Sequence, residues 1–217
     1  MTATKYDQAR NHAARVLEQD LLPVFLYHNA AHTLNEVVPV CAQLAELEGA
    51  AWEDCQLLGV AACFHDLGFT AARDSGPQGA AVRTTHEELS AQMARAALPG
   101  LDFSAQEIER ICRLILATSW AHQPQDLLEE IIRDADMSSI GGSLAYYRAT
   151  SDALRAEMAH FGITVSDERW LERQLEVLSG HTFYTRAARE LFDENRLANI
   201  GDNQRRLNAL RTGPKDY

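Results

Sequence analysis

The stretch AACFHDLGF, residues 61–69, places a histidine and an aspartate side by side in a nearly continuous apolar segment. The residues from Leu57 to Phe64 leave no polar face before this pair, so we expect His65 and Asp66 to be at least partly buried. Burying two ionisable groups costs free energy unless each finds an opposite charge, a hydrogen bond or a metal ion. The segment therefore predicts partners elsewhere in the chain, either structural hydrogen bonds or a metal site.

The composition describes a chain able to bury a proper core. It has 217 residues, of which 46% are hydrophobic, which favours one compact domain. A formal charge of −11 argues against a nucleic-acid binder, although a small phosphate-bearing ligand is compatible because a metal inside a pocket can override the field of the whole protein. The polar start and the lack of an apolar run of about 20 residues predict a cytoplasmic protein with no membrane contact.

Helical periodicity dominates, and no alternating strand of five or more residues is found, so the sequence predicts an all-α, single-domain helical bundle. The expected helices cover about residues 5–20, 32–48, 52–67, 85–98, 105–118, 125–137, 143–161, 167–179 and 185–211. Ser104 with Glu107 and Thr85 with Glu88 fit capping boxes. The four cysteines lie among apolar residues without a CxxC pair, which indicates reduced core thiols: Cys41, Cys55, Cys63 and Cys112.

The segment 68–85 has three glycines and one proline and follows the His-Asp pair directly. Such a composition predicts a loop over a site. Its two arginines, Arg73 and Arg83, are candidates for binding a substrate phosphate, with solvated loop arginines as the alternative.

Two further segments offer groups that could meet the pair. In YHNAAHTLNEV, residues 27–37, His28 and His32 are four apart and share a face if the segment is helical. In IIRDADMSSIG, residues 131–141, Asp136 continues an apolar i, i+4 series, whereas Asp134 points to the other side and is expected outside the core. A buried Asp136 needs a cation, which is either a metal ion or an arginine such as Arg110 or Arg113.

Two other histidines are candidates with a weaker signal. His86 lies in the first turn of its predicted helix, where the positive end of the helix dipole favours the neutral ring that coordinates metals. His122 lies just past a helix end, in a predicted loop. The remaining histidines have no matching partners and are expected to be structural or solvated: His12, His160 and His181.

The segments YHNAAH, FHDLGF, HEELSA and RDADMSSIG, in this order over about residues 24–142, resemble the HD superfamily of metal-dependent phosphohydrolases. The resemblance implies an all-α bundle, and the amphipathic helices of 143–217 are expected to pack on its core. It also implies a divalent metal with four ligands: His32, His65, Asp66 and Asp136. The ion would compensate the buried His-Asp pair.

Members of this superfamily with two metals have extra histidines after the pair, and His86 and His122 lie at plausible positions for a second ion bridged by Asp66. YHNAAH also resembles the start of the cyclic-nucleotide phosphodiesterase signature, in which the first histidine, here His28, is the proton donor. That signature continues with a histidine three residues after the aspartate, where this chain has Phe69.

Mixed nitrogen and oxygen ligands with open positions suit Mn²⁺, Fe²⁺, Co²⁺, Ni²⁺ or Mg²⁺. The resemblance therefore predicts hydrolysis of a nucleotide or other small phosphate ester by a metal-activated water. His28 is the first candidate proton donor and His86 the second, and Glu87 is a candidate for orienting the water or a histidine. A homodimer is compatible with the sequence, as the commonest assembly.

Two alternatives stay open at this point. The HD superfamily also includes mixed-valent di-iron oxygenases, which a second site at His86 and His122 would permit. The other alternative is a non-catalytic helical module that binds a nucleotide or a protein, with the histidines and aspartates holding only the core.

Overall fold

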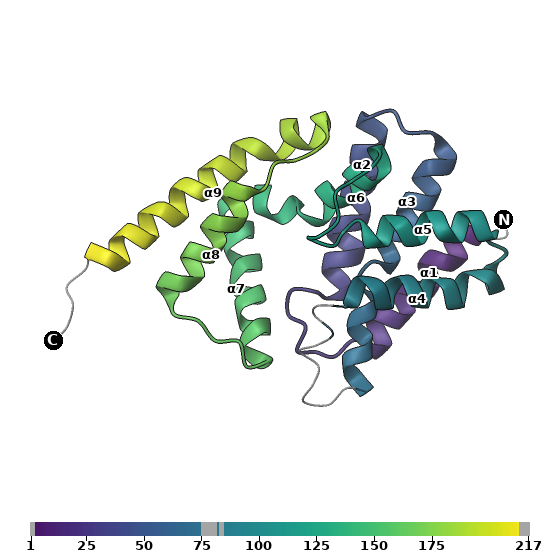
Figure 1. The fold of residues 1–217 in the computed structure, drawn as a ribbon, viewed down its shortest axis with the longest axis horizontal. Coiled ribbons are helices and arrows are strands. Elements are labelled where there is room, and N and C mark those ends of the chain that lie inside the picture. The colour runs from purple at the N-terminus through teal and green to yellow at the C-terminus, as the bar shows by residue number, and fades with distance from the viewer. Residues whose placement is uncertain (1–2, 75–81, 83–84, 213–217) are drawn as a thin grey trace.

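The computed structural model describes residues 3–74, 82 and 85–212, and within them it contains helices and no β-strand (Figure 1). The all-α prediction is confirmed. The longer elements are α1 (Lys5–Asp20), α2 (Val38–Leu47), α3 (Trp52–Phe64), α4 (His86–Ala97), α5 (Ala105–Leu116), α6 (Leu127–Asp136), α7 (Leu144–His160), α8 (Asp167–Gly180) and α9 (Arg186–Thr212). The shorter ones are a π-helix, η1 (His32–Val37), and three 3-10 helices, η2 (Leu67–Asp74), η4 (Leu98–Leu101) and η5 (Ser138–Gly141).

Of the two predicted capping boxes, the structure contains one. The Ser104 hydroxyl accepts a hydrogen bond from the Glu107 N–H at 3.3 Å, and the Glu107 carboxylate accepts one from the Ser104 N–H at 2.9 Å, so this capping box is confirmed. The capping box predicted for Thr85 and Glu88 is wrong. Thr85 has φ −135° and ψ 9° and makes no side-chain cap hydrogen bond, because an N-cap side chain reaches the first turn from an extended backbone.

Irregular backbone departs from the prediction on both sides of the candidate site. The helix predicted over 32–48 begins as the π-helix η1, and the one predicted over 52–67 ends at Phe64. The segment 68–85, predicted to be a loop, begins within the 3-10 helix η2. Of its two candidate phosphate ligands, Arg83 and the side chain of Arg73 lie outside the described part of the chain.

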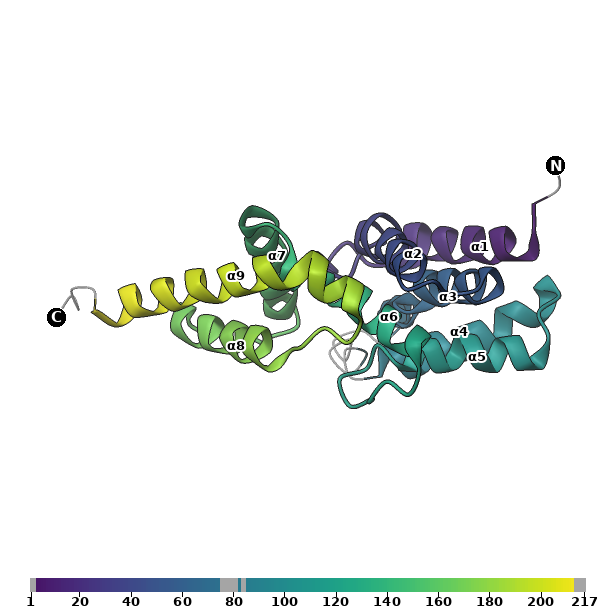
Figure 2. The ribbon, with the colours of Figure 1, turned by 90° about the horizontal axis from the view of Figure 1, so that it is seen from above.

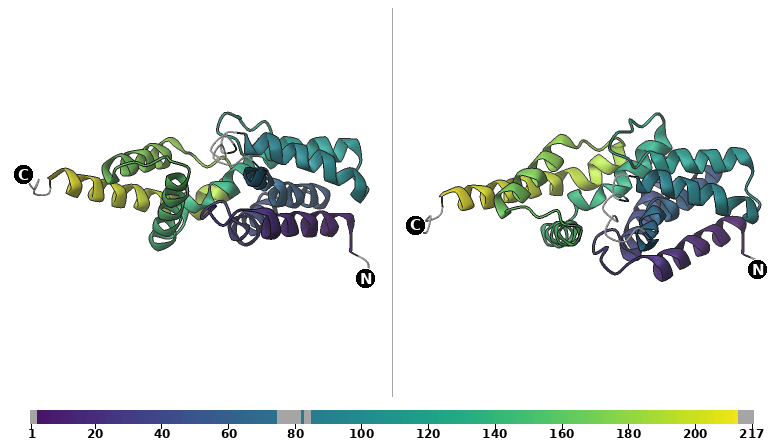
Figure 3. Two further views of the ribbon diagram at one scale, coloured as in Figure 1. Left: turned by 90° about the horizontal axis from the view of Figure 1, so that it is seen from below. Right: turned by 60° about the horizontal axis from the view of Figure 1, so that its bottom comes forward.

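Helices α1 to α6 form one bundle, and α7 to α9 form a second lobe beside it (Figures 1 and 2). Further views show that the C-terminal end of α9 projects beyond α7 and α8, on the side away from the bundle (Figure 3). Helix α3 lies in the middle of the bundle, and its C-terminal residues from Val60 to Phe64 are all buried. The span Trp52–Ala72 is long and apolar enough to cross a membrane, but 72% of its most apolar window is buried inside the fold. Its hydrophobicity is therefore that of a core helix.

The cysteines meet the prediction of reduced thiols. All four are free, and three of them, Cys41, Cys63 and Cys112, are buried.

The second lobe is attached to the bundle by a buried carboxylate. Asp134, which is 0% exposed, accepts hydrogen bonds from the backbone N–H groups of Tyr184 and Thr185 at 2.9 and 2.8 Å and from the Thr185 hydroxyl at 2.8 Å. These groups precede α9, so Asp134 ties the start of that helix to α6. The expectation that Asp134 lies outside the core is wrong, because the second lobe covers the face of α6 that helical periodicity assigned to solvent.

We predict that Asp134→Ala destabilises the protein by about 2–4 kcal/mol, because it leaves two buried donors on Thr185 and the partly buried Tyr184 N–H without an acceptor. Chemical denaturation followed by circular dichroism measures this loss. Asp152→Ala, at an exposed position of α7, is the matched control and should change stability by less than about 0.5 kcal/mol. A loss below about 1 kcal/mol for Asp134→Ala would contradict the assigned role.

Candidate metal centre

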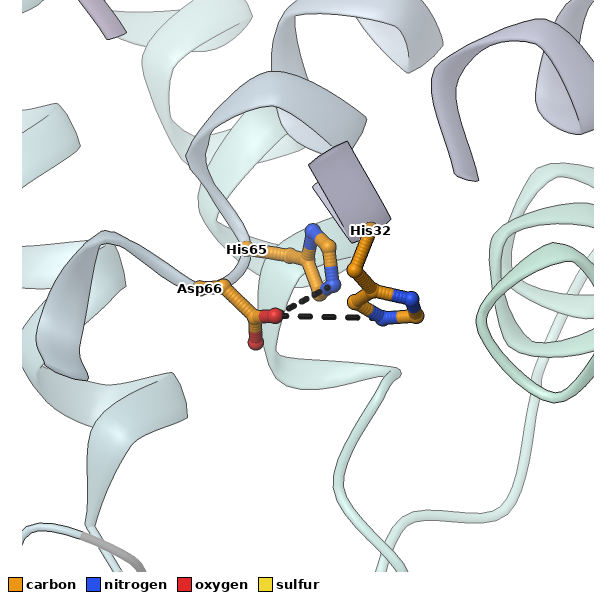
Figure 4. A group of neighbouring side chains, drawn as sticks. All are labelled: His32, His65 and Asp66. Atoms are coloured by element: carbon orange, nitrogen blue, oxygen red, sulfur yellow. Dashed lines mark ion pairs between the residues drawn. The ribbon is translucent and has the colours of Figure 1, made fainter. Parts of the chain in front are cut away.

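Four side chains from three regions meet where α3 ends. His32 is the first residue of η1, His65 and Asp66 follow the last turn of α3, and Asp136 is the last residue of α6. Figure 4 shows the Asp66 carboxylate turned toward both imidazole rings. One ligand atom from each of His32, His65 and Asp66 lies within 4.8 Å of the others, and all three residues are buried. The tertiary fold therefore supplies the partners that the buried pair requires.

The distances fit ligands around one ion. The His65 Nε2 lies 3.3 Å from the Asp66 Oδ2 and 3.4 Å from the Asp136 Oδ1, and the His32 Nε2 lies 3.4 Å from the same Asp136 oxygen and 3.9 Å from the Asp66 Oδ2. Ligand atoms about 2.1 Å from a shared ion, at octahedral or tetrahedral angles, lie roughly 3.0–3.4 Å from each other. Three of the four distances agree with that spacing.

The missing hydrogen bonds of the candidate ligand atoms also indicate a site for one ion. The His32 Nε2, the His65 Nε2 and the Asp66 Oδ2 are buried and have no hydrogen-bond partner among the described residues. A buried polar atom without a partner costs about 1–3 kcal/mol, and more when it is charged, so three in one cluster need an explanation. A divalent cation satisfies all three at once, and the residues present fit such an ion.

The outer ring nitrogens hold both histidines in a ligand orientation. The His65 Nδ1 lies 2.8 Å from the backbone oxygen of Ala62, which makes that nitrogen the donor and leaves a lone pair on Nε2. The His32 Nδ1 lies 3.1 Å from the Glu36 carboxylate, one turn further along. These partners fix the tautomer of each ring, with the hydrogen on Nδ1. Both Nε2 atoms therefore direct a lone pair at the centre of the cluster, where it can coordinate a metal ion.

The electrostatics of the cluster are those of a cation site. Burial disfavours a charge on His32, but the carboxylates of Asp136, Glu36 and Asp66 outweigh burial and raise its pKa to about 9. Burial likewise opposes ionisation of Asp136, yet His32 and His65 hold the pKa of this carboxyl well below its usual range. The carboxylates are therefore ionised at neutral pH. Their negative charge attracts either a proton or a metal ion to the lone pairs on the Nε2 atoms of His32 and His65.

A glycine and a serine bring α4 to this centre. A Cβ on Gly68 would lie 2.1 Å from the backbone oxygen of His86, so only glycine permits this approach. The buried Ser90 hydroxyl accepts from the Gly68 N–H at 2.8 Å and donates to the His65 carbonyl at 2.6 Å. These contacts place the first turn of α4 against the backbone of the His-Asp pair.

His86 therefore lies on the second face of the Asp66 carboxylate. Its Nε2 is 3.8 Å from the Asp66 Oδ1, the oxygen that does not face His65. Burial lowers the pKa of His86, so the ring is neutral, as expected from its place at a helix start. The Glu87 carboxylate lies 3.2 Å from the His86 Nδ1. Among the described residues this face offers a second ion two ligands, from His86 and Asp66.

Phe69, at the position where the phosphodiesterase signature has a histidine, fills the space between two candidate residues. Its ring stacks on His86 at a centroid distance of 4.2 Å and contacts His28 at 4.5 Å with the two rings tilted by 34°. It is 1% exposed and supplies packing but no ligand atom. Phe69 thus fixes the positions of His28 and His86 at the edge of the centre.

His28 has a partner that the sequence did not indicate. Its Nδ1 lies 2.7 Å from the carboxylate of Glu157 on α7, which is fully buried and also accepts from the backbone N–H groups of Tyr27 and His28 at 3.0 and 3.1 Å. The sequence offered only one signal for Glu157, a carboxylate inside an amphipathic helix. Glu157 and His28 are 129 residues apart, so the sequence pattern could not predict that they pair.

His122 lies elsewhere, and its predicted role as a ligand of a second ion is not supported. Its Nε2 is 2.8 Å from the carboxylate of the buried Glu129, which also accepts from the Gln125 N–H at 2.9 Å. Glu129 is seven residues before Asp136 in α6, which corresponds to roughly 10 Å along the helix. The His122 side chain closes the loop between α5 and α6.

A cavity of about 260 Å³ opens beside the centre and extends to the second lobe. At its inner end it is lined by Asp136 and by the three predicted catalytic residues, His28, His86 and Glu87. Its other walls come from the loop after α5 and from α6, α7 and α8. The C-terminal helices, expected only to cover the core, therefore form part of the pocket.

Comparisons with known proteins agree with this geometry. A model of the HD domain family matches residues 30–139, just over half of the chain. A crystal structure of a predicted HD superfamily hydrolase from an uncultured Thermotogales bacterium superimposes with a TM-score of 0.57 and 20% identity, over 94% of this chain and 91% of that chain. No curated protein matches the sequence.

The helical bundle brings His32, His65, Asp66 and Asp136 together in a cluster that could hold a divalent metal ion, and the chain belongs to the HD domain family. The family is one of metal-dependent phosphohydrolases. The family match ends at residue 139, so Glu157 and the pocket walls on α7 and α8 lie beyond it.

We predict that a divalent ion stabilises the folded protein. Adding Mn²⁺ at 100 times its dissociation constant should stabilise it by about 2.7 kcal/mol, and chelation should reverse the shift, because the ion binds the folded state. Differential scanning calorimetry measures both changes. Asp66→Ala removes the central ligand and should abolish the response, whereas Asp102→Ala, outside the cluster, should retain it. An unchanged response in Asp66→Ala would contradict the assignment.

We also predict a pH-dependent contribution from Glu157. Burial opposes its ionisation, but His28 and the two backbone donors outweigh burial and lower its pKa to about 2, from an ordinary 4.5. A depressed carboxyl pKa stabilises the folded state above the unfolded value and loses this effect as the pH falls. The stability difference between the wild type and Glu157→Gln should be about 3 kcal/mol at pH 6 and should shrink between pH 4.5 and about 2.

Urea unfolding at several pH values measures this difference. Glu194→Gln, at an exposed position of α9, is the control and should show no such window. A difference that stays constant with pH would show that Glu157 contributes through packing alone.

Proposed function

We propose that this protein is a metal-dependent phosphohydrolase that cleaves a small phosphate ester in the pocket between the bundle and the second lobe. The observation that carries the proposal is the set of convergent, buried and unpartnered ligand atoms of His32, His65 and Asp66, which opens through Asp136 onto that pocket. A bound divalent ion supplies Lewis acidity, which polarises a phosphoryl oxygen and makes water nucleophilic at neutral pH.

His28 is the proposed proton donor to the leaving oxygen. The Glu157 carboxylate accepts from its Nδ1–H and would stabilise the imidazolium form, in which the proton on Nε2, at the other side of the ring, is the one to be transferred. His28 lines the pocket beside Asp136, and its ring centroid is 6.2 Å from that of His32. The stacked Phe69 ring and the buried Glu157 hold this geometry before a substrate arrives.

His86 and Glu87 have a supporting role in the proposal. The neutral His86 faces the second oxygen of Asp66 and can accept a hydrogen bond from water at that edge of the centre. Glu87 lines the pocket, and its carboxylate lies 3.2 Å from the His86 Nδ1 without a hydrogen bond to it, so it acts on the ring in this proposal through its charge.

Two observations weigh against the alternatives. A di-iron oxygenase needs a second ion with its own ligands, and the third candidate ligand of that ion, His122, is paired with Glu129 instead of facing His86 and Asp66. A non-catalytic module gains nothing from three buried ligand atoms without partners, which cost stability unless an ion satisfies them. Measuring O₂ consumption beside phosphate release distinguishes hydrolysis from oxygenation.

The other expectations on partners fit this proposal. The formal charge of −11 favours a small substrate over a nucleic acid, and a cytoplasmic location would supply both phosphate esters and divalent ions. These statements remain predictions.

We predict that His28→Ala lowers kcat about 100-fold on an alkyl phosphate, because general acid catalysis contributes about 10²–10⁴. The effect on p-nitrophenyl phosphate should be small, since p-nitrophenolate leaves without a proton. Glu157→Gln should lower kcat on the alkyl ester about tenfold by releasing the His28 ring. Phosphate release with Mn²⁺, Fe²⁺ or Co²⁺ measures these rates.

His160→Ala, at an exposed histidine of α7, is the matched control and should keep the wild-type rates. Equal losses on both esters in His28→Ala would exclude the acid role and indicate a binding role instead. If no phosphate ester is hydrolysed with any of these ions, the proposed function is wrong.

A further inference from the structure

The far wall of the pocket is uncharged. It is formed by α7 and α8 of the second lobe, which lies beside the bundle (Figure 1), and its residues are Tyr147, Thr150, Ser151, Leu154, Gln174 and Val177. Within the part of the chain that the structure describes, no lysine or arginine lines this pocket. The charged lining groups, among them Asp136 and Glu87, all belong to the inner end. The two ends of the cavity therefore offer different chemistry to one ligand.

A chain of buried hydrogen bonds fixes one group in the far wall. The Asn203 Nδ2 donates to the Tyr147 hydroxyl at 2.6 Å, and the same hydroxyl donates to the Gln174 Oε1 at 3.1 Å. The exposed fractions of these residues are 1%, 2% and 8%, so water does not compete for the contacts. Because Asn203 presents a donor, the single Tyr147 proton is directed at Gln174.

This direction decides what the wall presents to a ligand. With its Oε1 occupied, Gln174 keeps an NH₂ group that has no hydrogen-bond partner among the described residues. Gln174 lines the pocket, and its Nε2 is not one of the fully buried atoms without a partner, so a ligand or a water molecule in the pocket can accept from this NH₂ group. The neighbouring Ser151 is held in the wall by Trp170, whose Nε1–H donates to the Ser151 oxygen at 3.0 Å. The far wall thus offers a positioned, neutral hydrogen-bond donor.

Size and charge limit the ligand further. Small-molecule pockets usually have about 300–1,000 Å³, so a cavity of about 260 Å³ takes a compact substrate. A second anionic group on that substrate would be buried without a counter-charge at the far wall, which is strongly unfavourable. The single anion therefore belongs at the metal end.

We propose that the substrate is a monophosphate ester of a small uncharged alcohol that carries a hydrogen-bond acceptor at the end remote from the phosphate, and that Gln174 selects this acceptor. The proposal rests on the proposed function, since it places the phosphate at the metal centre. It assigns Gln174 as a specificity residue and Tyr147 and Asn203 as the residues that position it.

The test compares three esters of similar shape with the full-length protein and Mn²⁺. Pyridin-3-ylmethyl phosphate has a ring nitrogen as acceptor, benzyl phosphate lacks it, and 3-carboxybenzyl phosphate adds a second anion. We expect kcat/KM to be about tenfold higher for the pyridyl ester than for the benzyl ester, the scale of one hydrogen bond, and lowest for the carboxylate. Equal values for all three would overturn the proposal.

Variants assign the preference to its residue. Gln174→Leu should bring the ratio between the pyridyl and benzyl esters close to one, and Tyr147→Phe should reduce it, because the amide is then free to turn. Gln204→Leu, an exposed glutamine on α9, is the matched control and should keep the wild-type ratio. A wild-type ratio in both Gln174→Leu and Tyr147→Phe would reject Gln174 as the selecting residue.

A binding measurement separates this inference from the chemistry. Saturation-transfer NMR with pyridin-3-ylmethanol and benzyl alcohol reports the far wall without any phosphate cleavage. Preferential binding of the pyridyl alcohol, lost in Gln174→Leu, would support the proposal even if none of the esters is hydrolysed. Equal binding of both alcohols would count against it, whatever the rate of hydrolysis.

Discussion

The compensation of one buried His-Asp pair is the constraint on which this structure depends. His65 and Asp66 end the helix at the centre of the bundle, and both are almost fully buried. The cost of burying them is lowered because His32 and Asp136 come from distant segments to meet them, and a bound cation would complete the set. The bundle therefore has to bring the start of η1, the end of α3 and the end of α6 to one point.

The surroundings of the centre follow from that requirement. Gly68 lets the start of α4 approach the pair, which places His86 against the second oxygen of Asp66. Phe69 then fills the space between His86 and His28 with an apolar ring. The five residues from His65 to Phe69 therefore have three roles. His65 and Asp66 are candidate ligands, Gly68 allows the close approach of α4, and Phe69 packs against the neighbouring histidine rings.

The second lobe adds a wall beside the candidate metal centre and so completes a pocket. Glu157 orients His28 across 129 residues of sequence, and the neutral wall around Gln174 closes the far end of the cavity. Asp134, two residues before the ligand Asp136, holds the start of α9. Helix α6 thus contributes Asp136 to the candidate metal centre and Asp134 to the contact with the second lobe, so both features share one rigid element.

The sequence by itself determined the class of fold, most helix positions and the four residues that meet at the candidate metal centre, because helical periodicity and closely spaced motifs are local signals. It misjudged Asp134 and His122, whose surroundings depend on elements far away in the chain. Only the tertiary structure decided that Glu157 holds His28 and that an oriented Gln174 faces the substrate pocket. Such pairings depend on how helices pack, and one helix's periodicity carries no information about the partner it will meet.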